Sequence, residues 1–301
     1  MSLIETASGL AGRHLKPEYF LYLRGCYSRA RQRLAPVIRK IYGTFDAADL
    51  RRHLEDRIGD DFDILMVHSS VDHMAPMYTG NPLDFVKMLT EFCGPDRTLA
   101  MPAFFFGDPK IGGAAATFQQ NPVFDLRRTP SQMGLATELF RRTRGVVQSR
   151  HPVYRISALG PLAEELVAGH ETAGSPAGTG TPFDFMAHRN TQIIGIGKPF
   201  EVLTHVHHPE DVMGDDFPVP ASDGDPFPMT IRDGKTEIDF DLNGRMLLWR
   251  RDMWKLRDIM GPDLLREWAF HNVPLFATRA ADVTRCVTEA AKAGITIYDK
   301  P

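Results

Sequence analysis

The sequence feature that most constrains the fold is a strand–helix–strand pattern between residues 63 and 106. Two short apolar runs, 63–70 and 98–106, are bounded by polar or turn residues, as buried strands are. The segment between them, 82–93, has helical periodicity and a proline at its expected first turn. A connection through a helix is typical of parallel strands, so the pattern predicts an α/β fold.

Further elements extend this pattern along the chain. A third buried strand is expected at 191–197, and a small antiparallel pair at 230–232 and 236–240. Asp46 is a plausible N-cap for the first helix of the main domain. We therefore expect a single α/β domain over 46–301, with a central mixed, largely parallel sheet flanked by helices. Further helices are predicted at 131–142, 161–168, 262–270 and 280–293.

Residues 1–45 form a separate basic segment in front of this domain. Residues 1–40 carry eight Lys or Arg and two Glu, with apolar residues interleaved. This pattern predicts an N-terminal helical extension of one or two amphipathic helices with a basic face. Three interpretations are open: packing on the same chain, packing on a second copy in a homodimer, or binding to a membrane surface or polyanion.

Composition and charge exclude several classes of protein. The 301 residues are 43% hydrophobic and 24% charged, which is ordinary for a globular chain. The net charge of the whole chain is −3, which favours neither nucleic acid nor anionic lipid as a partner. No apolar run approaches 18 residues, so no integral membrane segment is expected, and the N-terminus lacks the order of a secretory signal. The three scattered cysteines indicate neither a disulfide framework nor a zinc motif, which favours a cytoplasmic location.

A dense polar cluster follows the strand expected at 191–197. Residues 204–211 read Thr-His-Val-His-His-Pro-Glu-Asp, with three histidines, two carboxylates and a hydroxyl. A histidine beside a carboxylate can act as an acid or base near neutral pH. The same residue types can bind a metal ion, or form a polar surface loop without chemistry. The local pattern leaves these three interpretations open.

Three other polar segments are candidates for ligand binding. Residues 127–134 read Arg-Arg-Thr-Pro-Ser-Gln-Met-Gly, which predicts a helix start at Pro130–Ser131 that can hold an anion beside two arginines. His68, Ser69 and Ser70 end the first expected strand, where small hydroxyl residues let a ligand approach the backbone. The Ser-Arg-His-Pro segment at 149–152 is weaker evidence, because a lone His-Pro is more often structural.

Together these motifs resemble the aminoglycoside N3-acetyltransferase family, also called the antibiotic N-acetyltransferase family. The resemblance covers roughly residues 46–295 and depends on the order and spacing of several motifs. It implies an acetyl-CoA-dependent N-acyltransferase that needs no metal ion. The matching segments are 67–70, 94–102, Thr129-Pro130-Ser131 with Met133-Gly134, 149–152, 158–160 with Ala163, 195–197, and Thr204 with His207 and Glu210.

The resemblance also implies roles for individual residues. His207 is expected to be the general base, Glu210 to orient or polarise it, and Thr204 to lie near the thioester carbonyl. The resemblance and the segments above place the acetyl-CoA site at His68, Ser69, Ser70, Arg128, Thr129, Ser131, Ser149 and His151.

The acceptor is expected to be a small-molecule amine, such as an amino sugar or an aminoglycoside. Residues 201–231 contain seven Asp or Glu and no Lys or Arg, a pattern that attracts a cation. Within that stretch, Asp211, Asp215 and Asp216 are the candidate acceptor-binding residues. Two other classes of protein stay open: a metal-dependent hydrolase that uses His205, His207 and Asp211, and a catalytically silent scaffold recruited through residues 1–45.

Overall fold

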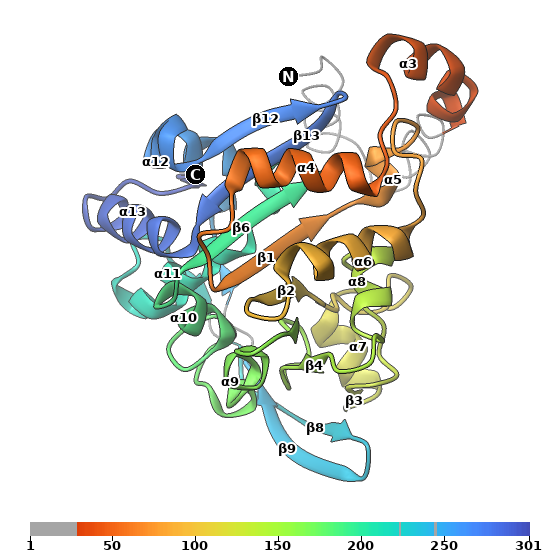
Figure 1. Ribbon diagram of the computed structural model, residues 1–301. Coiled ribbons are helices and arrows are strands. Elements are labelled where there is room, and N and C mark those ends of the chain that lie inside the picture. Colours follow the sequence, from red (N-terminus) through yellow and green to blue (C-terminus); the bar gives the residue numbers. More distant parts are fainter. Residues whose placement is uncertain (1–28, 223, 244–245) are drawn as a thin grey trace.

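The computed structural model describes residues 29–222, 224–243 and 246–301 (Figure 1). The strand–helix–strand unit is present as β1 (Ile64–Ser69), α6 (Pro82–Cys93) and β2 (Thr98–Pro102). β1 and β2 are parallel neighbours. The start of α6 is well capped, because the Asn81 side chain accepts hydrogen bonds from Leu83 N and Asp84 N while Asp84 accepts one from Asn81 N.

The central sheet has seven strands and is mixed, as predicted. Parallel pairing is limited to its centre, where β6 (Thr191–Ile196) and β2 lie on either side of β1. The flanking pairs are antiparallel, so the expectation of a largely parallel sheet is correct only for these three strands. The strand order is β12 (Arg266–Phe270), β13 (Val273–Arg279), β6, β1, β2, β5 (Ile156–Leu159), β4 (Val147–Gln148).

The helix predicted at 262–270 is wrong over most of its length. Helix α12 (Leu256–Leu264) covers only the first three residues of this segment, and residues 266–270 form the edge strand β12. A tight turn at His271 and Asn272, both with positive φ, joins β12 to β13 as a hairpin. Trp268 and Phe270 alternate along the strand and pack on the core, a tertiary contact that overrides the helical pattern.

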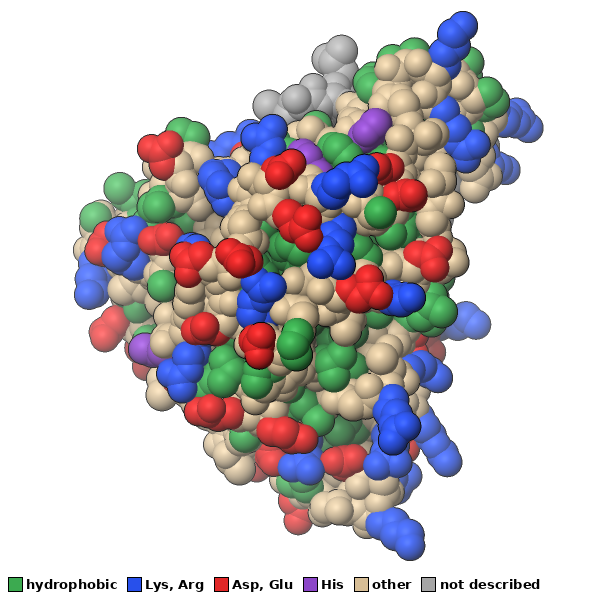
Figure 2. All heavy atoms as spheres, in the orientation of Figure 1, with side chains coloured by type: hydrophobic (Ala, Val, Ile, Leu, Met, Phe, Trp, Pro, Cys, Tyr) green, Lys and Arg blue, Asp and Glu red, His purple; other side chains and the backbone are tan. Residues whose placement is uncertain are grey.

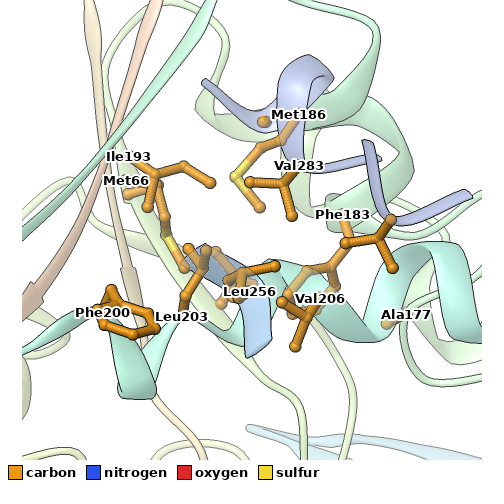
Figure 3. Packing of buried hydrophobic residues seen from close by; sticks show 14 of the residues in the cluster. Met66, Ala177, Phe183, Met186, Ile193, Phe200, Leu203, Val206, Leu256 and Val283 are labelled. Carbon is orange, nitrogen blue, oxygen red and sulfur yellow. The ribbon is translucent and has the colours of Figure 1, made fainter. Parts of the chain in front are cut away.

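Helices cover both faces of the sheet and enclose two cores. On one face α4 (Ala47–Ile58), α6 and α8 (Leu135–Phe140) pack on residues such as Leu65 and Ile194. On the other face, Met66 and Ile193 meet α10 (Pro182–Ala187), α12 and α13 (Ala280–Lys292). Figure 3 shows this second core, where Met66 and Ile193 lie near Phe200, Leu203, Val206, Leu256 and Val283. Helix α13 confirms the prediction at 280–293.

A small three-stranded sheet extends from the body. β8 (Phe227–Asp233) and β9 (Thr236–Leu242) form the predicted antiparallel pair, and β3 (Val123–Asp125) joins β8 in parallel. Phe118, Phe124 and Ile231 form its own small core. The remaining described elements are α3 (Ala35–Tyr42), α5 (Val71–Met74), α7 (Ala114–Gln120), α9 (Ala163–Val167), α11 (His207–Met213), β7 (Ala221–Ser222), β10 (Met246–Leu247), β11 (Arg250–Arg251), β14 (Tyr298–Asp299) and five 3₁₀ turns at 170–172, 200–202, 204–206, 214–216 and 253–255.

The described part of the basic extension is residues 29–45, where helical residues 29–33 precede helix α3. Helix α3 is the longer of these two helical stretches. It stands at the upper right of Figure 2, where Lys and Arg side chains surround apolar ones. Val37 and Ile41 are more than half exposed on it. The predicted helices within residues 1–28 lie outside the described residues. Among the residues that the structure does describe, no helix is long and apolar enough to cross a bilayer.

Candidate active site

The polar cluster at 204–211 lies beyond the carboxyl end of β6. A 3₁₀ turn over Thr204–Val206 leads directly into helix α11. His207 and Glu210 are three residues apart on this helix, so their side chains share one face. His205 and His208 are turned into the protein and buried, whereas the His207 side chain keeps 15% of its exposure.

His207 and three other side chains form a closed ring of hydrogen bonds. His207 Nδ1 lies 2.8 Å from Glu210 Oε2, and the Tyr298 hydroxyl donates to Glu210 Oε1 at 2.8 Å. Arg251 closes the ring, with its Nε 3.2 Å from the Tyr298 oxygen and its Nη1 3.2 Å from His207 Nε2. We call this set, His207, Glu210, Tyr298 and Arg251, the His207 ring.

The chemistry of arginine determines the direction of every hydrogen bond in the ring. A guanidinium group only donates, so His207 Nε2 accepts from Arg251. The proton of the neutral imidazole is therefore on Nδ1, from which it is donated to Glu210. Tyr298 accepts from Arg251 and donates to Glu210. This arrangement sets His207 as a base whose lone pair is on Nε2, supported by a carboxylate behind Nδ1.

The surroundings of Glu210 keep it ionised although it is buried. Burial raises the pKa of its carboxyl group, but the opposing effects of His207, Arg251 and Tyr298 are larger together. The pKa of Glu210 is consequently held below its usual value. A buried anion at this position can stabilise the imidazolium that forms when His207 takes a proton.

Tyr154 connects the His207 ring to the 149–152 segment. Its ring centroid lies 5.5 Å from that of His207 and 5.9 Å from that of His151, edge to face in both cases. His151 is buried, and its Nδ1 accepts hydrogen bonds from the backbone N–H groups of Val153 and Tyr154. His151 is thus beside the site, where it orders the turn that positions Tyr154.

Ser149 lies inside the protein and both of its hydrogen-bonding roles are occupied. Its Oγ accepts from Ile156 N at 2.9 Å and contacts His170 Nδ1 at 2.8 Å. Because His170 Nε2 donates to the Pro176 carbonyl, Nδ1 is the acceptor and the Ser149 hydroxyl donates to it. Ser149 therefore links the start of β5 to the 3₁₀ turn at 170–172.

His68, Ser69 and Thr204 carry buried polar atoms that have no partner among the described residues. Both ring nitrogens of His68, Ser69 Oγ and Thr204 Oγ1 belong to this group. Burial lowers the pKa of His68 to about 3, so its imidazole is neutral. Ser70 lies just outside the strand, as the N-cap of the short helix α5. Unpaired buried donors and acceptors are uncommon, and a bound ligand can satisfy them.

The structure contradicts the helix start predicted at Pro130–Ser131. Residues 127–134 form turns, and α8 begins at Leu135. Ser131 N donates to the Glu138 carboxylate, which also binds Arg141 and Arg142, so α8 holds this segment through a side chain. Arg128 and Thr129 instead line a surface hollow of about 530 Å³ beside β3 and β8.

The three acidic candidates differ in their surroundings. Asp211 Oδ2 accepts a hydrogen bond from Ala177 N at 2.8 Å. Burial raises the pKa of Tyr154 to about 12, and the charge of Asp211 adds to this effect. Asp211 is thus close to the His207 ring. Asp215 and Asp216 lie in the exposed 3₁₀ turn after α11. In the described part of the chain, no three His, Cys, Asp or Glu side chains converge as metal ligands.

Sequence patterns did not indicate three residues of the site. Arg251 is 44 positions from His207, and Tyr298 is 88 positions from Glu210. Each belongs to a two-residue strand, β11 or β14, and neither is near the 204–211 cluster in the sequence. Tyr154 could have been found from the sequence, because it stands two residues after the His151-Pro152 element.

Most of the site lies within a segment that matches a known protein family. A family model described as "Aminoglycoside 3-N-acetyltransferase" matches residues 66–292. The chain belongs to this family. The match includes Thr204, His207, Glu210 and Arg251, whereas Tyr298 lies beyond it.

Similar members of the aminoglycoside 3-N-acetyltransferase family are known from several bacteria. Aminoglycoside N(3)-acetyltransferase III of Salmonella sp is 30% identical over 194 residues, which is 60% of this chain and 66% of that protein. Aminoglycoside N(3)-acetyltransferase VII of Streptomyces paromomycinus is 30% identical over 50% of this chain and 54% of its own length. The matched part thus spans less than two thirds of these curated relatives.

Solved structures of aminoglycoside acetyltransferases share the fold. The crystal structure of AAC(3)-Xa superimposes with a TM-score of 0.70 at 18% identity, over 88% of this chain and 99% of that one. The structure of AAC-IIIb with CoASH gives a TM-score of 0.66 at 18% identity, over 85% and 100%. Sisomicin-bound AAC-VIa gives 0.68 at 21% identity, over 84% and 100%.

Proposed function

We propose that this protein transfers an acetyl group from acetyl-CoA to an amine of an amino sugar or aminoglycoside. The observation that carries the proposal is the directed pair of His207 and Glu210, with the proton on Nδ1 and the lone pair on Nε2. Membership of the aminoglycoside 3-N-acetyltransferase family supports the choice of donor and acceptor. The proposal includes a cytoplasmic location, as expected from the sequence.

In the proposed reaction the acceptor nitrogen attacks the thioester carbonyl directly. A new C–N bond forms and the C–S bond breaks, and the departing CoA thiolate takes up the proton that His207 has removed from the amine. His207 Nε2 takes the proton that the amine must lose, and Glu210 stabilises the imidazolium. Cys93 and Cys286 are buried, and burial raises the pKa of both thiols, which does not favour a covalent cysteine intermediate.

Thr204 is proposed to stabilise the oxyanion that develops on the thioester carbonyl. Its Oγ1 is buried and has no partner among the described residues, so the hydroxyl is available to donate. It lies three residues before His207, in the turn that leads into the same helix. A preorganised donor near the reacting carbonyl contributes to the rate by stabilising charge that appears in the transition state.

The proposed donor site divides the candidate residues into two groups. Ser70, Arg128, Thr129 and Ser131 are proposed to contact CoA, and the exposed Arg128 side chain suits a phosphate group. Ser149 and His151 are proposed to support the site from inside the protein, because both are buried and hydrogen-bonded there. His68 and Ser69 are proposed to meet the bound donor through their unpaired polar atoms. Asp211, Asp215 and Asp216 are proposed to attract the cationic acceptor.

Substitution of His207 tests the proposal. His207→Ala should lower turnover with acetyl-CoA and sisomicin or gentamicin by roughly 10²–10⁴-fold, the contribution of a positioned general base. Release of the CoA thiol measures turnover, and calorimetric titration with CoA checks that the donor still binds. His188→Ala is the matched control, because His188 is exposed on the surface. Near-normal turnover in His207→Ala would contradict the assignment of the base.

A further inference from the structure

The lone pair that His207 needs as a base is occupied by a side chain of the same protein. Arg251 Nη1 lies 3.2 Å from His207 Nε2, and a guanidinium group can only donate at that distance. A nitrogen that already accepts a hydrogen bond from a cation cannot receive a proton from a substrate. The His207 ring, as the structure shows it, is therefore closed to base catalysis.

We propose that Arg251 is an internal gate that holds the place of the cationic acceptor and withdraws when the acceptor enters. The inference depends on the proposed function for the identity of the acceptor, but not for the contact itself. A protonated amine resembles the guanidinium in the respects that matter here, because it is a cation and donates N–H groups. Both groups cannot occupy Nε2 at the same time, so acceptor binding and Arg251 contact with His207 exclude each other.

The local structure allows the Arg251 side chain to leave His207 without a change in the backbone pairing. Arg251 is on the two-residue strand β11, whose backbone pairs with Tyr298 on β14. Its guanidinium carbon lies 5.7 Å from the centre of the Tyr298 ring, and its Nε donates to the Tyr298 hydroxyl. Rotation of the outer side-chain bonds can therefore break the Nη1 contact while the backbone stays paired. Glu210 remains held by Tyr298 and His207 during this change.

The neighbouring arginine offers a matched control. Arg250 stands beside Arg251 on β11 and carries the same charge, but its side chain binds Asp299 at 3.0 Å. No described contact joins Arg250 to the His207 ring. A comparison of Arg251→Ala with Arg250→Ala thus separates the contact with His207 from a general loss of positive charge on this strand.

Chemical modification of His207 tests the gate without any substrate. Diethylpyrocarbonate acylates an unprotonated imidazole nitrogen: a C–N bond forms, an anhydride C–O bond breaks, and the imidazole proton is lost with ethyl carbonate. Removing the competing donor in Arg251→Ala should speed modification of His207 roughly five- to tenfold. Peptide mapping by mass spectrometry follows His207, with the exposed His188 as an internal reference. Arg250→Ala should react at the wild-type rate.

A second variant shows whether a packing defect in Arg251→Ala, and not the lost hydrogen bond, changes the modification rate. Arg251→Met keeps an unbranched side chain over the Tyr298 ring but has no N–H donor, and it should show the same acceleration. Equal modification rates in Arg251→Ala, Arg251→Met and Arg250→Ala would overturn the proposal.

Steady-state kinetics give a second readout that separates this inference from the proposed function. With acetyl-CoA and sisomicin, Arg251→Ala should lower the acceptor KM roughly five- to tenfold. A lower kcat with an unchanged KM would show that Arg251 acts in the transition state and would overturn the gate. Faster modification of His207 together with no acetyl transfer by any variant would retain the gate and contradict the proposed function.

Discussion

Individual side chains in this protein are constrained by hydrogen-bond direction and by close packing. In the His207 ring, one permanently protonated group, Arg251, determines the tautomer of His207 and the donor role of Tyr298. Close packing is most severe at Gly195 in β6, which lies opposite Phe276 of β13. The Phe276 ring covers the space where a side chain at position 195 would begin.

Gly195→Ala should destabilise the fold by about 1–3 kcal/mol or more, because the added methyl group overlaps the Phe276 ring. Urea unfolding of the purified protein measures the change. Gly113→Ala is the control, since a Cβ atom at that position meets open space. Equal stability of the two variants would show that β6 and β13 can separate enough to admit a side chain.

Helices and strands in this protein are held in place by contacts with residues outside the element. Helix α8 shows this, because Glu138 ties it to the turn before it through Ser131 N and to Arg141 and Arg142 behind it. Burial raises the pKa of Glu138, but these donors outweigh burial and lower the pKa to about 2. The ionised carboxylate is thus a structural component of this region.

The stability that Glu138 contributes should depend on pH in a defined direction. Its folded pKa of about 2 lies below the ordinary value of 4.5, so the contribution is complete above pH 4.5 and is lost as pH falls toward 2. We expect the wild type to be more stable than Glu138→Gln at pH 6, and the difference to shrink between pH 4.5 and 3. Urea midpoints at each pH measure this. A difference that stays constant over this range would contradict the linkage.

The body of the protein begins earlier in the chain than its first long helix. Phe45, placed in the extension by the sequence analysis, is 2% exposed and packs with Tyr78 and Phe270. Arg39 also reaches the body, where its Nε donates to the Pro76 carbonyl. The end of the extension is therefore attached to the sheet layers, while Val37 and Ile41 of α3 stay exposed.

Phe45→Ala should lower the free energy of unfolding by about 3–5 kcal/mol, the usual cost of truncating a buried phenylalanine. Phe106→Ala is a matched control, because the Phe106 ring is 53% exposed. That variant should stay within about 1 kcal/mol of the wild type. Thermal and urea unfolding provide the measurement. A Phe45→Ala variant as stable as Phe106→Ala would mean that the segment before α4 adds little to the core.

Features that depend on neighbouring residues in the chain could be predicted from the sequence. The helix at 82–93, the helix at 280–293 and the β8–β9 pair follow local periodicity and capping, and the structure contains all three. The spacing of His207 and Glu210 is equally local, because residues three apart on a helix share a face. Family membership was also predicted from short motifs in a fixed order.

Features that depend on distant segments required the folded coordinates. The arrival of Arg251 and Tyr298 at His207 joins segments far apart in the chain. The strand at 266–270 depends on the pairing of its hairpin partner β13 with β6, and the turn that replaces a helix start at Pro130 is hydrogen-bonded to Arg155 and Phe104. No local pattern predicts such tertiary contacts. Their free energy comes from burial and pairing between elements, and not from the secondary-structure propensity of a single element. A base beside a carboxylate was therefore visible in the sequence, whereas the guanidinium that covers its lone pair was not.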